Sequence, residues 1–234
     1  ILDSIPAGKY YLVTRDLMGC MKTDSVMITE PDGMELTGSE VSITPDGNYN
    51  ISCNDGSDGY IKLAIAGGSG IYSYAWNGPG GYGATTRDIS GLKAGTYTAT
   101  VTDQNGCILM PVPVYTLTEP MALVITEVLS SSEEGSHNIN CNDGTGSINV
   151  NVTGGSTGNY TYEWTSADGS GIVQGQEDQP ALTAGTYRLT VTDLNKCVSI
   201  RDYTLTQPEP IVNQLIPTHI TCQSPTFSNG MIDL

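Results

Sequence analysis

The chain has 234 residues, and its 25 acidic side chains outnumber the 9 lysines and arginines, which leaves a formal net charge of −16. A surface this acidic repels phosphate groups, so the charge argues against a nucleic-acid partner and against binding to anionic lipid. The sequence also lacks any apolar run of about 18 residues, so we expect no segment inserted in a membrane.

One sequence pattern occurs three times and sets the organisation of the chain. Its copies each end on a cysteine and read IPAGKYYLVTRDLMGC, LKAGTYTATVTDQNGC and LTAGTYRLTVTDLNKC, at residues 5–20, 92–107 and 182–197. A second cysteine series agrees, since Cys53 and Cys141 lie 88 residues apart. The repeating unit is therefore nearly ninety residues long, which is enough for one modest hydrophobic core.

This spacing divides the chain into four parts. We expect two complete repeats at 32–120 and 121–208, with the C-terminal part of another repeat at 1–31 and the N-terminal part of the next at 209–234. Because the chain begins and ends within repeats, we interpret it as a window from a longer array. The lack of a signal peptide in such a window says nothing about localisation.

Each complete repeat reads as a series of short β-strands. Turn residues interrupt the chain about every ten residues, and hydrophobic side chains alternate with polar ones, as in strands with one buried face. Two prolines, Pro111 and Pro113, place the last strand at a sheet edge. About seven such strands predict an all-β fold of tandem immunoglobulin-like antiparallel β-sandwiches in a head-to-tail array. In chain order, the strands expected in the first complete repeat cover 34–43, 60–66, 72–76, 85–91, 96–102 and 108–118.

The Ala-Gly-x-Tyr motif has a structural explanation in this fold. A leucine, a glycine turn and a tyrosine that opens the next strand are similar to a tyrosine corner, in which the tyrosine hydroxyl bonds to upstream backbone. The related copies of this motif place Tyr10, Tyr97 and Tyr187 in that role. We therefore expect these tyrosines to stabilise the fold and not to act in catalysis.

The order of these motifs resembles the SprB repeat of Bacteroidota surface proteins. The matching segments of the first complete repeat are CNDGSDGYIKLAIAGGSGIYSYAW, AGTYTATVTDQNGC and TLTEP, and those of the second are CNDGTGSINVNVTGG, YTYEW and AGTYRLTVTDLNKC. Lys196 departs from the pattern, since it replaces the usual glycine before Cys197, and the segment 222–234 has a longer turn. The resemblance implies a segment of a long secreted adhesin used in gliding or attachment, exported by the type IX route and located at the extracellular cell surface.

The six cysteines recur in Gly- and Thr-rich repeats without any Cys-x-x-Cys pair, which favours disulfides in an oxidising compartment over a zinc site. Cys53 lies in the turn before the second strand and Cys107 in the turn after the strand 96–102, so the topology places them at opposite ends of the sandwich, roughly 20 Å or more apart. A disulfide needs Cα atoms within about 7 Å. We therefore hypothesise a bridge between consecutive repeats, Cys53–Cys197. The alternatives are bridges within each repeat, Cys53–Cys107 and Cys141–Cys197, or free thiols.

With the bridge between repeats, the remaining cysteines would bond to repeats partly or wholly outside this chain. They are Cys20, Cys107, Cys141 and Cys222.

The Asn-Asp-Gly turns contain candidate calcium ligands. Asp55, Asp58 and Asp143 lie beside backbone carbonyl groups, and oxygen-rich turns bind Ca²⁺. The same residue types also form ordinary tight turns without any ion. No other cofactor is expected.

The sequence shows no triad-like order of Ser, His and Asp and no phosphate-binding loop, so we expect a protein that is not an enzyme. The favoured interpretation is a stiff spacer that projects a distal binding tip and transmits force. Its expected partners are neighbouring repeats of the same chain, outer-membrane secretion or motility machinery, and an extracellular surface or polysaccharide contacted through other regions. The alternative is a carbohydrate-binding or accessory β-sandwich module of a large secreted hydrolase, which an exposed aromatic platform on one repeat alone would favour.

Overall fold

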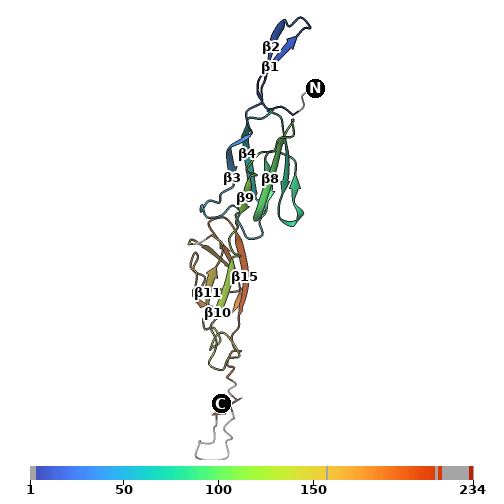
Figure 1. Ribbon diagram of the computed structural model, residues 1–234. Coiled ribbons are helices and arrows are strands. Elements are labelled where there is room, and N and C mark those ends of the chain that lie inside the picture. Colours follow the sequence, from blue (N-terminus) through green and yellow to red (C-terminus); the bar gives the residue numbers. More distant parts are fainter. Residues whose placement is uncertain (1–3, 157, 214–215, 218–231, 234) are drawn as a thin grey trace, which may run out of the picture. The chain divides into compact units, whose positions relative to one another are not determined.

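The computed structural model in Figure 1 describes residues 4–156, 158–213, 216–217 and 232–233, and it contains two compact units. The first unit runs from Ile1 to Pro120 and the second from Met121 to Leu234. Antiparallel β-strands joined by turns form the regular structure of both units. Among the described residues the only helical element is one short 3-10 turn, η1 (Pro79–Gly81).

The complete repeat of the first unit is a sandwich of two antiparallel sheets. Its strand order matches the immunoglobulin arrangement, in which strands A, B and E face strands C, F and G. One sheet has the order β3 (Glu35–Val41), β4 (Gly59–Ala66) and β7 (Ile89–Leu92). The other has the order β6 (Gly83–Ala84), β5 (Tyr72–Asn77), β8 (Gly95–Asp103) and β9 (Val114–Leu117).

The complete repeat of the second unit has the same topology. One sheet has the order β10 (Val124–Leu129), β11 (Gly146–Thr153) and β13 (Gln179–Leu182). The other has the order β12 (Thr161–Ser166), β14 (Gly185–Thr192) and β15 (Val198–Leu205). The predicted fold class, an all-β fold with antiparallel sandwiches, is confirmed.

Alternation along the strands produces one core inside each sandwich. In β4, Ile61 and Leu63 point into the core while Lys62 between them is exposed. Burial of one such aliphatic side chain stabilises the fold by about 1.5–3 kcal/mol. The two tryptophans, Trp76 and Trp164, are 2% and 0% exposed, so each repeat has one indole at its centre.

The segment before the first complete repeat is a hairpin of β1 (Gly8–Arg15) and β2 (Met21–Ile28), which pair only with each other. Leu12 occupies the place that Ala99 has in β8, yet it is 62% exposed while Ala99 is fully buried. The difference arises because no second sheet covers this hairpin within the described residues.

At the other end of the chain, β16 (Ile216–Pro217) pairs with β17 (Ile232–Asp233). Cys222 and most of the expected partial repeat 209–234 lie outside the described residues. In the part of the chain that the structure describes, no helix has the length and hydropathy needed to cross a bilayer.

Candidate functional site

The motifs that recur in both repeats gather at the two ends of each sandwich. We define the exit end as the loop before the second strand together with the segment that leaves the last strand: 50–58 with 118–120 in the first repeat, and 138–146 with 206–208 in the second. We define the entry end as the segment that enters the repeat and the two turns beside it: 32–33, 67–69 and 103–107 in the first repeat, and 121–122, 154–156 and 193–197 in the second. The eight residues of β4 run from the exit end to the entry end, so the ends lie about 26 Å apart at ~3.3 Å per residue.

One asparagine fixes the departing chain at the exit end of the first repeat. The backbone N–H groups of Asn50 and Ile51 both donate to the Thr118 carbonyl oxygen, at 2.9 and 3.0 Å. In return, the Thr118 N–H donates to Oδ1 of Asn50 at 2.9 Å. Thr118 therefore has both backbone groups satisfied, although it lies beyond the end of β9.

The Asn-Asp-Gly turn holds the next two residues. Asn54 Nδ2 donates to the Pro120 carbonyl oxygen at 3.2 Å, and the Asp55 N–H donates to the Glu119 carboxylate at 2.9 Å. Asp55 has a φ of +58°, a left-handed conformation that Asp and Asn tolerate better than other non-glycine residues. The turn motif therefore positions two hydrogen-bond donors, Asn54 Nδ2 and the Asp55 N–H, toward the exit segment.

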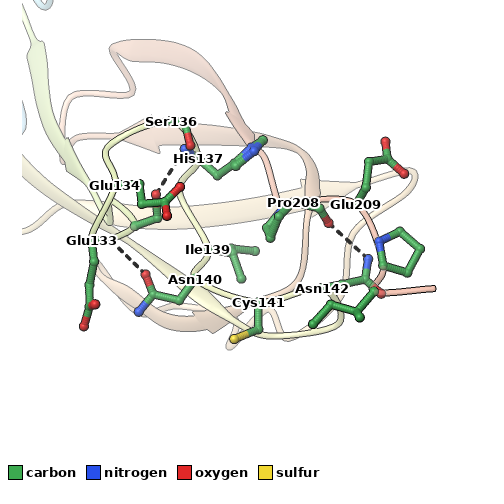
Figure 2. A pocket seen from close by; sticks show the side chains of 13 residues that line it. Glu133, Glu134, Ser136, His137, Ile139, Asn140, Cys141, Asn142, Pro208 and Glu209 are labelled. Carbon is green, nitrogen blue, oxygen red and sulfur yellow. Dashed lines mark hydrogen bonds between the residues drawn. The ribbon is translucent and has the colours of Figure 1, made fainter. Parts of the chain in front are cut away.

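The second repeat reproduces this set of bonds at residues 88 positions later. Figure 2 shows one of them, in which Asn142 Nδ2 donates to the Pro208 carbonyl oxygen at 3.3 Å. The others join Asn138 and Ile139 to the Thr206 carbonyl oxygen at 3.0 and 3.1 Å, Thr206 N–H to Asn138 Oδ1 at 2.9 Å, and Asp143 N–H to Gln207 Oε1 at 3.1 Å.

At the entry end, a Gly-Gly turn lies directly against the incoming segment. The Gly68 N–H donates to the Asp32 carbonyl oxygen at 2.7 Å, and the Gly155 N–H donates to the Met121 carbonyl oxygen at 2.8 Å. The preceding glycine in the second repeat, Gly154, has a φ of +82°, and a Cβ there would lie 1.8 Å from the Ala122 carbonyl oxygen. Glycine is therefore required for this close approach of two backbones.

A buried aspartate joins the two turns of each entry end. Asp103 Oδ2 accepts from the Ser69 N–H at 3.1 Å, and Oδ1 accepts from the Asn105 and Cys107 N–H groups at 2.9 Å each. Burial raises the pKa of Asp103, but these backbone hydrogen bonds outweigh it and hold the pKa below its ordinary value. In the second repeat Asp193 accepts from Ser156 at 2.7 Å and from Cys197 at 2.9 Å.

The three motif tyrosines each bond to the backbone four residues upstream. Tyr97 donates to the Lys93 carbonyl oxygen at 2.9 Å, Tyr187 to that of Thr183 at 2.8 Å, and Tyr10 to that of Pro6 at 2.7 Å. Tyr97 and Tyr187 are almost fully buried. This is the bond that defines a tyrosine corner, and it keeps these hydroxyls occupied in the fold.

The cysteines of the complete repeats are in two states. Cys53 and Cys197 are disulfide-bonded, whereas Cys107 and Cys141 have free, exposed thiols, as does Cys20 in the hairpin. The alternative bridges within a repeat, Cys53–Cys107 and Cys141–Cys197, are therefore not formed. The physical reason is the length of the sandwich, because each repeat has one cysteine at its exit end and the other at its entry end.

The calcium candidates have structural partners at the exit end. The Asp58 carboxylate accepts hydrogen bonds from the backbone N–H (3.1 Å) and the hydroxyl of Ser52. Burial raises the pKa of Asp58, and the Ser52 hydrogen bonds lower it by more. Asp55 and Asp143, at φ +58° and +59°, are turn residues whose N–H groups hold the exit segment. Among the described residues, no three His, Cys, Asp or Glu side chains lie together as a metal site would require.

A hollow of about 790 Å³ lies at the exit end of the second repeat, between the loop at 132–142 and the segment 208–211 (Figure 2). Ile139 and Cys141 line it together with acidic side chains that include Glu133 and Glu209. Among the described residues, no Phe, Tyr or Trp side chain lines this hollow. His137 also lines the hollow, and its buried Nδ1 has no hydrogen-bond partner among the described residues.

The tryptophans are not positioned to stack on a ligand. Trp76 Nε1 donates to the Thr86 carbonyl oxygen and Trp164 Nε1 to that of Gln176, both at 2.9 Å. Both rings are buried, so neither provides the exposed aromatic platform that a carbohydrate-binding module would use.

Sequence reasoning missed the asparagine that fixes the exit segment, Asn50 in the first repeat and Asn138 in the second. The signal was present, because Asn-Ile-x-Cys-Asn-Asp-Gly recurs before each second strand and a Leu-Thr-x-Pro sequence recurs after each last strand. Their contact spans 68 residues, so neither motif alone indicates its partner.

Comparison with known proteins identifies one family. The SprB repeat model matches residues 49–81 and 136–169. Each match begins at the exit-end loop and extends past the Tyr-x-Tyr-x-Trp sequence of its repeat. None of the curated proteins searched matches the chain.

Proposed function

We propose that this chain, in which two segments match the SprB repeat, is a stiff, non-enzymatic spacer within a long secreted filament of the cell-surface adhesin type. Each repeat positions the next, holds a distal binding tip away from the cell and transmits force used in gliding or attachment. Its direct partners are neighbouring repeats of the same chain. Outer-membrane secretion or motility machinery, and the extracellular surface or polysaccharide that is gripped, are contacted through other regions.

The observation that carries this proposal is the fixation of two consecutive residues by two different repeats. Pro120 accepts a hydrogen bond from Asn54 at the exit end of the first repeat. The next residue, Met121, accepts one from Gly155 at the entry end of the second. The peptide bond between them therefore joins two anchored residues.

A free linker is what gives domain arrays their flexibility. The end-to-end distance of a flexible linker grows as about 5–6 Å × √n for n free residues, so freedom between domains falls as n approaches zero. Here no free residue separates the last anchored position of one repeat from the first anchored position of the next. A stiff spacer requires this kind of junction.

Small-angle X-ray scattering tests the proposal. Inserting Gly-Ser-Gly-Ser-Gly between Pro120 and Met121 adds the missing linker, and the same insertion after Gly80, an exposed turn residue, serves as a matched control. We expect the junction insertion to broaden the distribution of overall dimensions, and the control insertion to leave it unchanged. A wild-type chain already as broadly distributed as the junction variant would overturn the spacer function.

A further inference from the structure

The first and last strands of each repeat lie in different sheets. In the first repeat β3 is an edge strand of one sheet and β9 an edge strand of the other, and in the second repeat β10 and β15 have the same places. The chain enters before the first strand and leaves after the last one, at opposite ends of the sandwich. Tension along the chain therefore pulls β3 toward the entry end and β9 toward the exit end, and no ladder of the described residues joins these two strands.

One asparagine side chain joins the ends of the two strands. Asn50 Nδ2 donates to the Ser42 carbonyl oxygen at 2.7 Å, and Oδ1 of the same amide accepts from the Thr118 N–H at 2.9 Å. Ser42 directly follows β3, and Thr118 directly follows β9. Because tension draws Ser42 toward the entry end and Thr118 toward the exit end, the Asn50 amide lies between two groups that are pulled apart.

The second repeat has the same link. Asn138 Nδ2 donates to the Ser130 carbonyl oxygen at 3.0 Å, and its Oδ1 accepts from the Thr206 N–H at 2.9 Å. Ser130 directly follows β10, and Thr206 directly follows β15. The loops between serine and asparagine read ITPDGNY in the first repeat and SSEEGSH in the second, so they have the same length and share only their glycine. The link is therefore retained although the loop that carries it differs.

Neighbouring contacts hold both sides of the link in the first repeat. The Ser42 N–H donates to the Tyr60 carbonyl oxygen at 3.0 Å, so the residue after β3 is still attached to β4. The loop before Asn50 is closed by the Thr44 N–H, which donates to the Tyr49 carbonyl oxygen at 2.9 Å. Asn50 itself is half-buried, and partial exclusion of water strengthens its hydrogen bonds. The amide is therefore held in place before any tension acts.

We propose that Asn50 and Asn138 are the force-bearing links of their repeats, which pass tension from the end of the first strand to the segment that leaves the last strand. The proposal rests on the spacer function, in which the chain transmits force, and it assigns that transmission to named side chains. The ladders between β3 and β4 and between β8 and β9 carry the remaining load in the first repeat. The first and last strands slide past each other only after the asparagine amide has lost one of its partners.

The tyrosine corner provides a matched control. Tyr97 also makes a side-chain bond to backbone near the exit end, but its partner Lys93 lies in the connection between β7 and β8. Tyr187 and Thr183 have the same relation to β13 and β14. Neither bond joins a first strand to a last strand, so tension applied at the chain ends does not load it directly.

The test compares two pairs of substitutions in the full chain, Asn50→Ala with Asn138→Ala and Tyr97→Phe with Tyr187→Phe. The chain is held by its two ends at constant force in an optical trap, under reducing conditions, and its unfolding rate is recorded. Urea unfolding kinetics without tension give the acceleration that each pair causes through general destabilisation.

For the asparagine pair, the acceleration under force should exceed the acceleration without tension by about tenfold, because one hydrogen bond broken before the transition state has up to this effect on a rate. For the tyrosine pair, the two accelerations should be equal. An asparagine pair without this excess, or a tyrosine pair with the same excess, would overturn the proposal.

A conservative pair keeps the test valid where the alanine variants do not fold. Asn50→Asp and Asn138→Asp retain an oxygen that accepts from the threonine N–H but lose the donor to the serine carbonyl oxygen, so the same excess under force is expected. The absence of an excess in this pair would also contradict the proposal. The Gly-Ser insertion, read by scattering without tension, tests the spacer function separately, since a broad wild-type distribution would refute the spacer and leave the asparagine measurement unaffected.

Discussion

The turn before Cys197 contains a residue with a strained backbone, Lys196, and replacing it with glycine should stabilise the second repeat. Lys196 has a φ of +72°, whereas the equivalent residues of the other two copies are Gly19 and Gly106, at φ +90° and +85°. A side chain in this left-handed region costs about 1–2 kcal/mol relative to glycine. Glycine also increases the conformational entropy of the unfolded chain, which cancels about 0.4–1 kcal/mol of the stabilisation gained by relieving the strain. Lys196→Gly should therefore raise the free energy of unfolding by about 0.5–1 kcal/mol.

The reciprocal change isolates the backbone contribution. No heavy atom lies within 4 Å of a Cβ placed on Gly106, so Gly106→Ala introduces strain without a clash, and it should destabilise the first repeat by a similar amount. Lys196→Ala removes the lysine charge but keeps the strained backbone, so it is the control for electrostatics.

Each repeat has its own fluorescent reporter, which makes the assay specific. Trp76 reports on the first repeat and Trp164 on the second, so a Trp→Phe change in one repeat leaves the other visible in urea unfolding. If Lys196→Gly is no more stable than Lys196→Ala, the left-handed strain is not stored in the fold and the reasoning is wrong.

Four other outcomes follow from the same structure. Tyr187→Phe should lower the free energy of unfolding by about 1–3 kcal/mol, because the Tyr187 hydroxyl bonds to the backbone. Tyr203→Phe should be neutral or stabilising, because the buried Tyr203 hydroxyl has no hydrogen-bond partner. Urea unfolding followed by Trp164 fluorescence measures both. Gly154→Ala should lower the stability of the second repeat by at least about 2 kcal/mol, since its Cβ meets backbone, and the same assay measures it. Because the folded pKa of Asp103 is depressed, its contribution to stability is present above the ordinary aspartate pKa and is lost as pH falls toward the folded value; Asp103→Asn should flatten this acid dependence of the Trp76 unfolding midpoint. In single-molecule pulling, the first repeat should unfold at lower force, because β9 pairs with β8 over four residues and β15 pairs with β14 over eight; equal forces would contradict this.

Much of the fold could be predicted because it depends on local patterns. The alternation of Ile61 and Leu63 with polar neighbours indicated a buried face. The prolines Pro111 and Pro113 indicated an edge strand, which is confirmed, but the strand expected at 108–118 covers only Val114–Leu117. The tyrosine motif pointed to a hydroxyl bonded upstream, and Tyr97 makes such a bond over four residues. In each case the sequence signal lies within a few residues, so it can be read without knowing the distant parts of the chain.

The exit end could not be predicted because its partners are distant in sequence. Asn50 and Asn54 read as turn residues, and nothing local shows that they fix the chain at Thr118 and Pro120. Asp58 read as a candidate calcium ligand, since an aspartate in a Gly-rich turn has the same local pattern whether it binds an ion or accepts hydrogen bonds from Ser52. The contacts of Asp58 with Ser52 are seen only in the folded structure, and calcium binding stays a prediction.

The repeated motifs of this chain therefore fix its ends more than its core. Cores tolerate exchange among hydrophobic residues when the total volume and the pattern are kept, and Ala99 in one repeat and Leu189 in the other are both fully buried although leucine is larger. The end motifs have less freedom, because a backbone approach such as that at Gly154 admits no Cβ and each exit asparagine must provide both a donor and an acceptor. A protein that works by placing one repeat after another has its strictest chemical requirements where the chain enters and leaves, and those are the positions where the same residues return.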